Sequence, residues 1–298
     1  MRRGWLLAAW CACVVAACGR CAAADVSGAT DERIDVAGSL RLPDAAPAAD
    51  GTDVAVAGMS GLTWLGADRW AAVIDTGEAF LTFALELGPD GAPRTIRDLA
   101  AVRLAERHDD EDVAPCPPGV VRRLVADADD RPHLFVCEED TPAIHVVAAD
   151  GRRVGTVPIP DAFGSRRPNR GLEAVCLAID GSSLWTANEE SLPADGPPPA
   201  PNAGTVVRLA RVPLPGGPLG NQLAYAVDPP HAGVPVGGGE VYSGVVALAA
   251  LPDGRLLVLE RSAARVLPPF ENRLFVVDPR AAADVSDVAG DLAARRET

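Results

Sequence analysis

Beyond residue 50 the chain alternates short apolar runs with turns rich in Gly, Pro and Asp, which is the pattern of β-strands joined by tight connections. Long stretches with the 3.6-residue period of an amphipathic helix are missing. Residues 98–107 are compatible with a helix or a strand, and residues 281–296 with a terminal helix. The pattern predicts an all-β protein. Its clearest runs, each ending beside an acidic residue, are 70–74, 133–137, 183–187 and 255–259.

These runs belong to a longer unit that recurs along the chain. Each copy begins with a strand of small and apolar residues, passes through a turn and returns in an apolar strand that ends in charged residues. Third strands are expected at 143–147 and 273–277. Because two strands cannot bury a face alone, we expect the copies to pack on one another. The copies are residues 60–75, 119–139, 171–190 and 243–261.

A repeat of four-stranded units at this spacing is typical of a β-propeller. We therefore predict a propeller of about six four-stranded blades, with five or seven blades, or a β-sandwich, as alternatives. Residues 76–110 and 200–235 show no clear copy of the unit. The Pro-rich residues 192–201 are expected to form a long surface loop.

The N-terminus has the features of a secretory signal peptide. Two arginines precede an apolar stretch at residues 5–18, which is too short for a stable transmembrane helix. Small residues up to Ala24 offer a cleavage site, so we expect residues 1–24 to be removed and 25–298 to form one domain. Alternatively, residues 15–18 resemble a bacterial lipobox, in which Cys18 is lipidated. The protein is expected to be exported: periplasmic, extracellular or lipid-anchored to the cell envelope.

Charge and motifs exclude several classes of function. The formal net charge is −14, which argues against nucleic-acid binding because phosphate recognition needs a basic face. All basic residues are arginine, so Schiff-base chemistry and a P-loop lysine are excluded. No Gly-x-Ser-x-Gly elbow occurs. We expect a monomer that contacts a membrane only through an N-terminal lipid.

Three cysteines lie beyond the N-terminal segment: Cys116, Cys137 and Cys176. An exported protein can form a disulfide, and Cys116 with Cys137 is the local pair. The alternative is that they are small buried apolar residues. No cluster of Cys and His has zinc-site spacing.

Acidic residues recur at similar places in the copies. If inner strands converge on a central channel, these side chains face one another, and mutual repulsion together with burial raises their pKa values unless a cation lies among them. Oxygen donors of this kind suit calcium or magnesium. The alternative is that each carboxylate caps a turn or pairs with an arginine, as Arg261 and Arg265 would allow for Glu260. The candidates are Asp75, Glu138, Glu173, Glu189 and Glu260, and the predicted metal ligands are Asp75, Glu173, Glu189 and Glu260.

Several blocks resemble, in this order, the phytase-like family ("esterase-like activity of phytase"). The most specific is 250–262, Ala-Leu-Pro-Asp-Gly-Arg-Leu-Leu-Val-Leu-Glu-Arg-Ser. The resemblance covers about residues 50–290 and implies a β-propeller fold. The other blocks are Gly58-Met59-Ser60-Gly61-Leu62, Asn169-Arg170-Gly171-Leu172-Glu173-Ala174, Ala187-Asn188-Glu189-Glu190-Ser191-Leu192 with Asp195-Gly196, Asn272-Arg273-Leu274 and Ala283-Asp284-Val285-Ser286.

The chain also departs from the family pattern. The acidic residue expected after the Gly-Val-Ser block is missing at 242–245, and Asp110-Glu111-Asp112 is only a poor match for the acidic block of the second copy. Family members commonly continue beyond the segment matched at 283–286. Either the ring closes with fewer strands, using residues 33–42 as a closing strand, or the chain is one blade short.

The resemblance implies a metal-dependent phosphoester hydrolase, with Glu173 and Glu189 as leading ligands or bases. A bound calcium ion would clamp a phosphate and polarise a water molecule. The substrate would be a small-molecule phosphoester. The alternative is a non-catalytic, envelope-associated propeller that binds an unknown ligand or partner.

Overall fold

The computed structural model describes residues 36–75, 77–106, 110–125, 132–215, 220–231, 241–264 and 269–294 of the 298-residue chain. The predicted signal peptide and Cys18 lie outside the described residues. Within them, regular structure is almost entirely β, with one α-helix, α1 (Pro118–Leu124), and one 3-10 helix (Asp161–Ser165). In this part of the chain no helix is long and apolar enough to cross a membrane.

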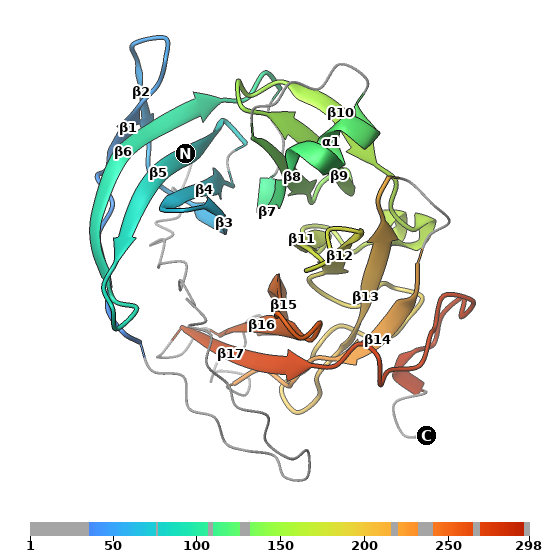
Figure 1. Ribbon diagram of the computed structural model, residues 1–298. Helices are drawn as coiled ribbons and strands as arrows, with labels where there is room; N and C mark the ends of the chain where they lie inside the picture. Colours follow the sequence, from blue (N-terminus) through green and yellow to red (C-terminus); the bar gives the residue numbers. More distant parts are fainter. Residues whose placement is uncertain are drawn as a thin grey trace, which may run out of the picture.

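Four antiparallel sheets are arranged around a common axis, like the blades of a propeller (Figure 1). In each sheet the strand order follows the chain, and the first strand lies nearest the axis. The all-β propeller prediction is confirmed. Blade one holds β3 (Met59–Gly66), β4 (Arg69–Ile74), β5 (Ala79–Leu87) and β6 (Pro93–Arg103); blade two holds β7 (Asp110–Cys116), β8 (His133–Glu138), β9 (Ala143–Ala148) and β10 (Arg153–Val157). Blade three holds β11 (Leu172–Leu177), β12 (Ser183–Asn188), β13 (Val206–Pro213) and β14 (Gln222–Ala226); blade four holds β15 (Tyr242–Ala250), β16 (Leu256–Ala263) and β17 (Phe270–Val277).

Much of the core lies between the blades, and the sheets of blades one to three are covered on both faces. In β8 alternate side chains point to opposite neighbours. Leu134 and Val136 pack in the cluster shared with blade one, whereas Phe135 and Cys137 pack in the cluster shared with blade three. Every residue of β8 is buried. This two-sided burial explains why the strands appear as continuous apolar runs rather than as an alternation of apolar and polar residues.

The number of blades differs from the prediction. The described residues form four blades between residues 59 and 277, not about six. The spans that showed no repeat contain outer strands: β5 and β6 in one, β13 and β14 in the other. Outer strands lie far from the axis and do not share the Gly-rich signature of the inner strands.

The second repeat begins earlier than predicted. Residues 119–121, taken from the sequence as its first strand, lie in helix α1, and the inner strand of blade two is β7. Two prolines, Pro117 and Pro118, begin the helix, where their missing N–H groups cost nothing. Strand β7 begins with three acidic residues, Asp110-Glu111-Asp112, so the pattern of apolar residues does not identify it as a strand.

Residues 98–103 belong to strand β6, which is one of the two alternatives left open for this segment. Two other expectations are corrected. Residues 281–292 form turns and bends with a bridge at Asp284 and no α-helix. Residues 36–42 form no closing strand; β1 (Ala45–Pro47) and β2 (Asp53–Ala55) form a separate hairpin beside β6, joined through a bridge between Ala48 and Ala101. The Pro-rich loop has no strand, as predicted, but its Leu192 and Asp195 are buried.

The cysteines take the second of the two alternatives. Cys116, Cys137 and Cys176 are free and buried, and no disulfide joins them. Burial raises the pKa of the Cys116 thiol to about 12. All three therefore serve as small apolar residues between blades.

Candidate functional site

Each inner strand, the first strand of its blade, carries a β-bulge. The register shifts between Met59 and Gly61, Asp110 and Asp112, Leu172 and Ala174, and Val245 and Ala247. A bulge leaves one residue without a cross-strand partner and redirects its side chain. The bulged residues are Ser60, Glu111, Glu173 and Val246, so blades two and three each have a glutamate at this position.

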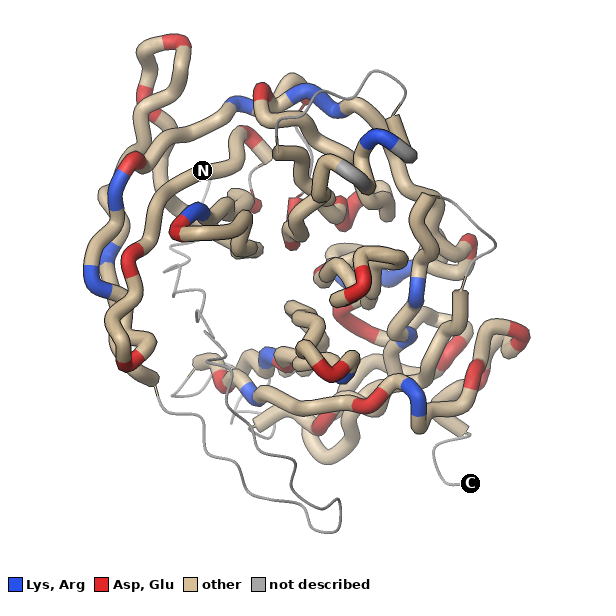
Figure 2. The backbone as a smooth tube through the Cα atoms, viewed as in Figure 1, with Lys and Arg blue, Asp and Glu red and all other residues tan. Residues whose placement is uncertain are grey.

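A second set of equivalent positions follows the second strand of each blade. On the second strand, one residue pairs with the inner-strand residue that immediately precedes the bulge. In blades one to four this residue is Ile74, Glu138, Asn188 and Glu260, respectively. The next residue along the chain, which we call the ring position, is acidic in three blades and basic in the fourth. Figure 2 shows acidic segments of blades two and three around the centre of the ring. The ring positions are Asp75, Glu139, Glu189 and Arg261.

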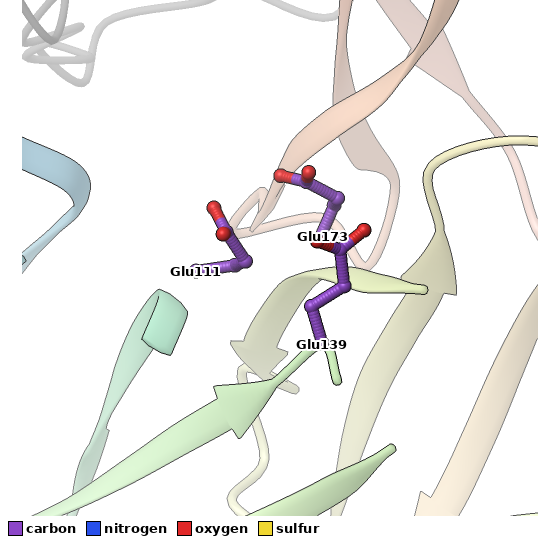
Figure 3. A group of neighbouring side chains, drawn as sticks. All are labelled: Glu111, Glu139 and Glu173. Atoms are coloured by element: carbon purple, nitrogen blue, oxygen red, sulfur yellow. The ribbon is translucent and has the colours of Figure 1, made fainter. Parts of the chain in front are cut away.

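Two of the bulged glutamates and one ring-position glutamate lie close together. Glu111 of β7, Glu139 at the end of β8 and Glu173 of β11 each place one oxygen so that all three oxygens lie within 4.8 Å of one another (Figure 3). Glu139 and Glu173 are buried, and Glu111 is partly buried. We call these residues the carboxylate trio. The arrangement brings together blades two and three, since Glu173 comes from the next blade.

The environment of the trio disfavours bare negative charge. Burial raises the pKa of Glu173 well above its usual value, and the charges of Glu189 and Glu111 raise it further. Burial also raises the pKa of Glu189 to about 7, although Arg170 opposes this effect. A cation placed among these groups would stabilise their ionised forms.

Two arginines and a tyrosine border the carboxylates. Arg170 Nη1 donates to Glu189 Oε2 at 3.0 Å, and its guanidinium carbon lies 4.6 Å from the centroid of the Tyr242 ring. Arg261 Nε donates to the Tyr242 hydroxyl at 3.1 Å. The site therefore combines several carboxylates with two arginines that both contact Tyr242, Arg170 through the ring face and Arg261 through the hydroxyl.

Contacts between the backbones of adjacent blades hold these side chains. Gly171 N–H donates to Glu139 Oε1 at 2.7 Å. A Cβ atom on Gly171 would lie 2.6 Å from the Glu139 carbonyl oxygen, and one on Gly244 would lie 2.6 Å from that of Glu189. Glycine at both positions thus permits the close approach of neighbouring blades.

Asp112 is a further link between blades two and three. It is buried, and its carboxylate accepts N–H bonds from Val113 at 2.8 Å and Val175 at 2.9 Å. Burial raises the pKa of Asp112 to about 8, although both N–H groups lower it. The first residues of β7 are therefore anchored on β11 directly beside the trio.

The predicted metal ligands are placed at different positions in the blades. Glu173 belongs to the trio, and Glu189 lies beside it in the ion pair with Arg170. Glu260 accepts hydrogen bonds from Tyr225 Oη at 2.7 Å and from the Asp228 N–H at 3.1 Å. Asp75 lies exposed at the end of β4 in blade one and is not part of the trio.

Glu138 points away from the ring positions, with its Oε2 2.7 Å from His145 Nε2. Glu111 and Glu139, which complete the trio, were not among the predicted ligands. The repeat could have identified Glu139, because Glu139 in the second copy occupies the position that Glu189 occupies in the third copy. Glu111 was concealed because the first strand of the second copy was placed at residues 119–121.

Comparison with known proteins agrees with the sequence blocks. The family model described as phytase-like, "esterase-like activity of phytase", matches residues 54–295. No curated protein shows significant similarity to the chain.

The solved structures that match the chain share little sequence with it. A candidate 6-phosphogluconolactonase from Bacteroides uniformis is 16% identical with a TM-score of 0.36; the match covers 74% of this chain and 55% of that one. The periplasmic gluconolactonase of Pseudomonas aeruginosa is 18% identical with a TM-score of 0.34, covering 79% and 74%. Virginiamycin B lyase from Staphylococcus aureus is 11% identical with a TM-score of 0.31, covering 75% and 72%. The match to the family model, which extends over most of the chain, decides the assignment: the chain belongs to the phytase-like family.

Proposed function

We propose that the protein is a calcium-dependent hydrolase of phosphoesters whose metal is held by Glu111, Glu139 and Glu173. Membership of the phytase-like family supports hydrolase activity. The observation that carries the proposal is that three carboxylate oxygens, from blades two and three, lie within 4.8 Å of one another.

The donor set fits calcium. All three donors are carboxylate oxygens, which hard cations prefer. Two oxygens bound to one calcium ion at about 2.3–2.6 Å can be at most about 5 Å apart, whereas for magnesium the limit is about 4 Å. The three oxygens lie within 4.8 Å of one another, which is close enough for one calcium ion to bind all three after small side-chain movements. The N–H of Gly171 further orients Glu139.

The surrounding residues supply the remaining functions. A bound calcium ion would contribute Lewis acidity toward a phosphoryl oxygen. Glu189 is buried beside the trio and is suited by its position to accept a proton from water. Arg170 holds the Glu189 carboxylate in place through its bond to Oε2. In this scheme Glu173 is a metal ligand and Glu189 is the general base.

The test is phosphate release from phytate and from p-nitrophenyl phosphate, with calcium or with EGTA. We expect turnover only with calcium, and a loss of about 100-fold or more in Glu189→Gln if Glu189 is the base. Glu86→Gln, an exposed glutamate of β5, is the matched control. Absence of turnover with calcium from all tested phosphoesters would remove the catalytic proposal.

A second candidate function is binding without catalysis. Blade four supports it, because Val246 replaces glutamate at the bulge and Arg261 replaces an acid at the ring position. In this case the protein would bind calcium and an envelope ligand with no turnover. Both candidates are compatible with the expected export, and mass spectrometry of the mature N-terminus would distinguish lipidated Cys18 from cleavage after Ala24.

A further inference from the structure

We propose that Arg261, oriented by Tyr242 and accompanied by Arg170, forms an anion subsite beside the carboxylate trio, and that this subsite selects dianionic phosphomonoesters over neutral esters. The proposal rests on the proposed function for its substrate class. Anion binding itself, however, is measurable without turnover.

The first observation is a reversal of charge at an equivalent position. Arg261 follows Glu260, the residue that pairs just before the bulge of β15, so it occupies the ring position of blade four. The corresponding residues in the other blades are Asp75, Glu139 and Glu189. One cation therefore stands where symmetry of the repeat would place a fourth carboxylate.

The second observation is that Arg261 is held in place without being neutralised by a direct ion pair. Its Nε donates to the Tyr242 hydroxyl at 3.1 Å. Within the described residues, no carboxylate lies in ion-pair distance of its guanidinium. Its charge nevertheless opposes the burial that raises the pKa values of Glu173 and Glu189, so Arg261 lies close to both carboxylates.

Arg170 adds a second cation to the same ring. Its guanidinium lies 4.6 Å from the centroid of Tyr242, while Arg261 contacts the hydroxyl of that tyrosine. Arg170 also binds Glu189, the proposed base. The tyrosine thus links two guanidinium groups at the border of the trio.

Blade packing fixes this geometry. Gly244 pairs with Arg261 in the sheet, and Val245 N–H donates to the carbonyl oxygen of Glu189 at 3.0 Å. A Cβ atom on Gly244 would lie 2.7 Å from Glu189 Cγ. Blade four is therefore seated directly against Glu189, and this contact sets how far Arg261 stands from the carboxylates.

The chemistry of the pair determines the ligand. Guanidinium groups donate parallel hydrogen bonds that match the oxygens of a phosphate, and they remain charged at all relevant pH values. A dianionic phosphoryl group can interact with Arg261 on one side and with a cation held by the trio on the other. A neutral ester or lactone offers no charge to the arginine and gains little from it.

The direct test is equilibrium binding of inorganic phosphate in the presence of calcium, measured by calorimetry. We expect Arg261→Gln to weaken phosphate binding by about tenfold or more. Calcium affinity should stay equal or increase, because the substitution removes a positive charge near the carboxylates. Arg255→Gln, at the opposite end of β16, is the matched control and should leave both affinities unchanged.

The second arm measures selectivity. For wild-type protein we expect kcat/KM to favour p-nitrophenyl phosphate over p-nitrophenyl acetate, and Arg261→Gln to reduce the first by about tenfold or more while leaving the second unchanged. Tyr242→Phe keeps the ring and loses the hydroxyl, so it should give a smaller loss in phosphate binding.

Two results would overturn the inference: wild-type protein that does not bind phosphate, or Arg261→Gln that weakens phosphate and calcium binding equally, as a purely structural role would. If no substrate is turned over, the proposed function fails, while the binding experiment still decides for or against the anion subsite.

Discussion

Glu139 of blade two is bound by the backbone of blade three: its Oε1 accepts the N–H of Gly171 at 2.7 Å. The same carboxylate is one of the three whose oxygens lie within 4.8 Å of each other. The contact that docks two blades therefore also orients a candidate metal ligand. Stability of the interface and affinity for a cation are linked through one side chain.

This link predicts the effect of Gly171→Ala. The new Cβ would meet the Glu139 carbonyl oxygen at 2.6 Å and Glu139 Cγ at 2.9 Å. We expect a loss of about 1–3 kcal/mol in unfolding free energy, together with weaker calcium binding, because Glu139 must move.

Urea unfolding and calorimetry would measure both effects. Gly164→Ala is the control, since a Cβ there has no neighbouring atom within 4 Å, and we expect a change within about 0.5 kcal/mol. Equal behaviour of the two variants would contradict the role assigned to Gly171.

Glu173→Gln should change stability in opposite directions with and without metal. In EGTA the variant is expected to be at least as stable as wild type, because burial disfavours the ionised carboxylate and a neutral amide removes that cost. With calcium at 100 times its Kd, wild type gains about 2.7 kcal/mol, and the variant should lose most of this gain.

Thermal unfolding at several calcium concentrations would show this crossover. Glu86→Gln should follow wild type under both conditions, because Glu86 is exposed on β5. A Glu173→Gln protein that calcium stabilises as much as wild type would exclude Glu173 as a ligand.

The pH dependence of the calcium-free protein should report Glu189. Its pKa is raised from 4.5 to about 7, mainly by burial. For an acid with a raised folded-state pKa, the stability contribution is fully present below pH 4.5 and is lost as pH rises through 7. We expect Glu189 to contribute a fall of up to about 3 kcal/mol in unfolding free energy between these values, and Asp112 and Glu173, whose pKa values burial also raises, add to it.

Urea unfolding in EGTA from pH 4 to pH 8 would measure this decrease. Glu189→Gln cannot titrate and should give a flatter profile than wild type. A profile unchanged by the substitution would mean that Glu189 does not have the raised pKa assigned to it.

A buried ion pair should control the C-terminal segment. Arg208 donates to both oxygens of Asp195 at 2.7 Å and also to the carbonyl oxygen of Val288 at 2.8 Å. Because both charges are buried, Arg208→Met leaves Asp195 unpaired, and we expect a loss of about 3–5 kcal/mol.

Hydrogen exchange should show that amide protection falls first in residues 285–293, which Arg208 and Asp195 hold against blade three. Arg94→Met is the control. It removes an exposed pair with Asp90 and should leave the unfolding free energy almost unchanged. Preserved protection of residues 285–293 in Arg208→Met would show that the segment is anchored elsewhere.

The sequence by itself determined the strands, the turns between them and the positions of most copies of the repeat. Short apolar runs with turns between them define the strands, and first, third and fourth copies of the repeat were located correctly because their inner strands carry glycine and small residues. The family followed from ordered blocks, of which the one ending in Glu260-Arg261-Ser262 is the most specific. These signals are short-range, so they are legible without knowledge of which blade packs on which.

Only the tertiary structure decided which carboxylates meet. Glu138 and Glu139 are adjacent in sequence, yet one contacts His145 and the other faces Glu173, because successive residues at a strand end point to opposite sides. The bulges of β7 and β11 then bring Glu111 and Glu173 toward Glu139. Strand register and the packing of one blade on the next depend on contacts between residues far apart in the sequence. Only these contacts determine that Glu111, Glu139 and Glu173, rather than other buried acids, lie together.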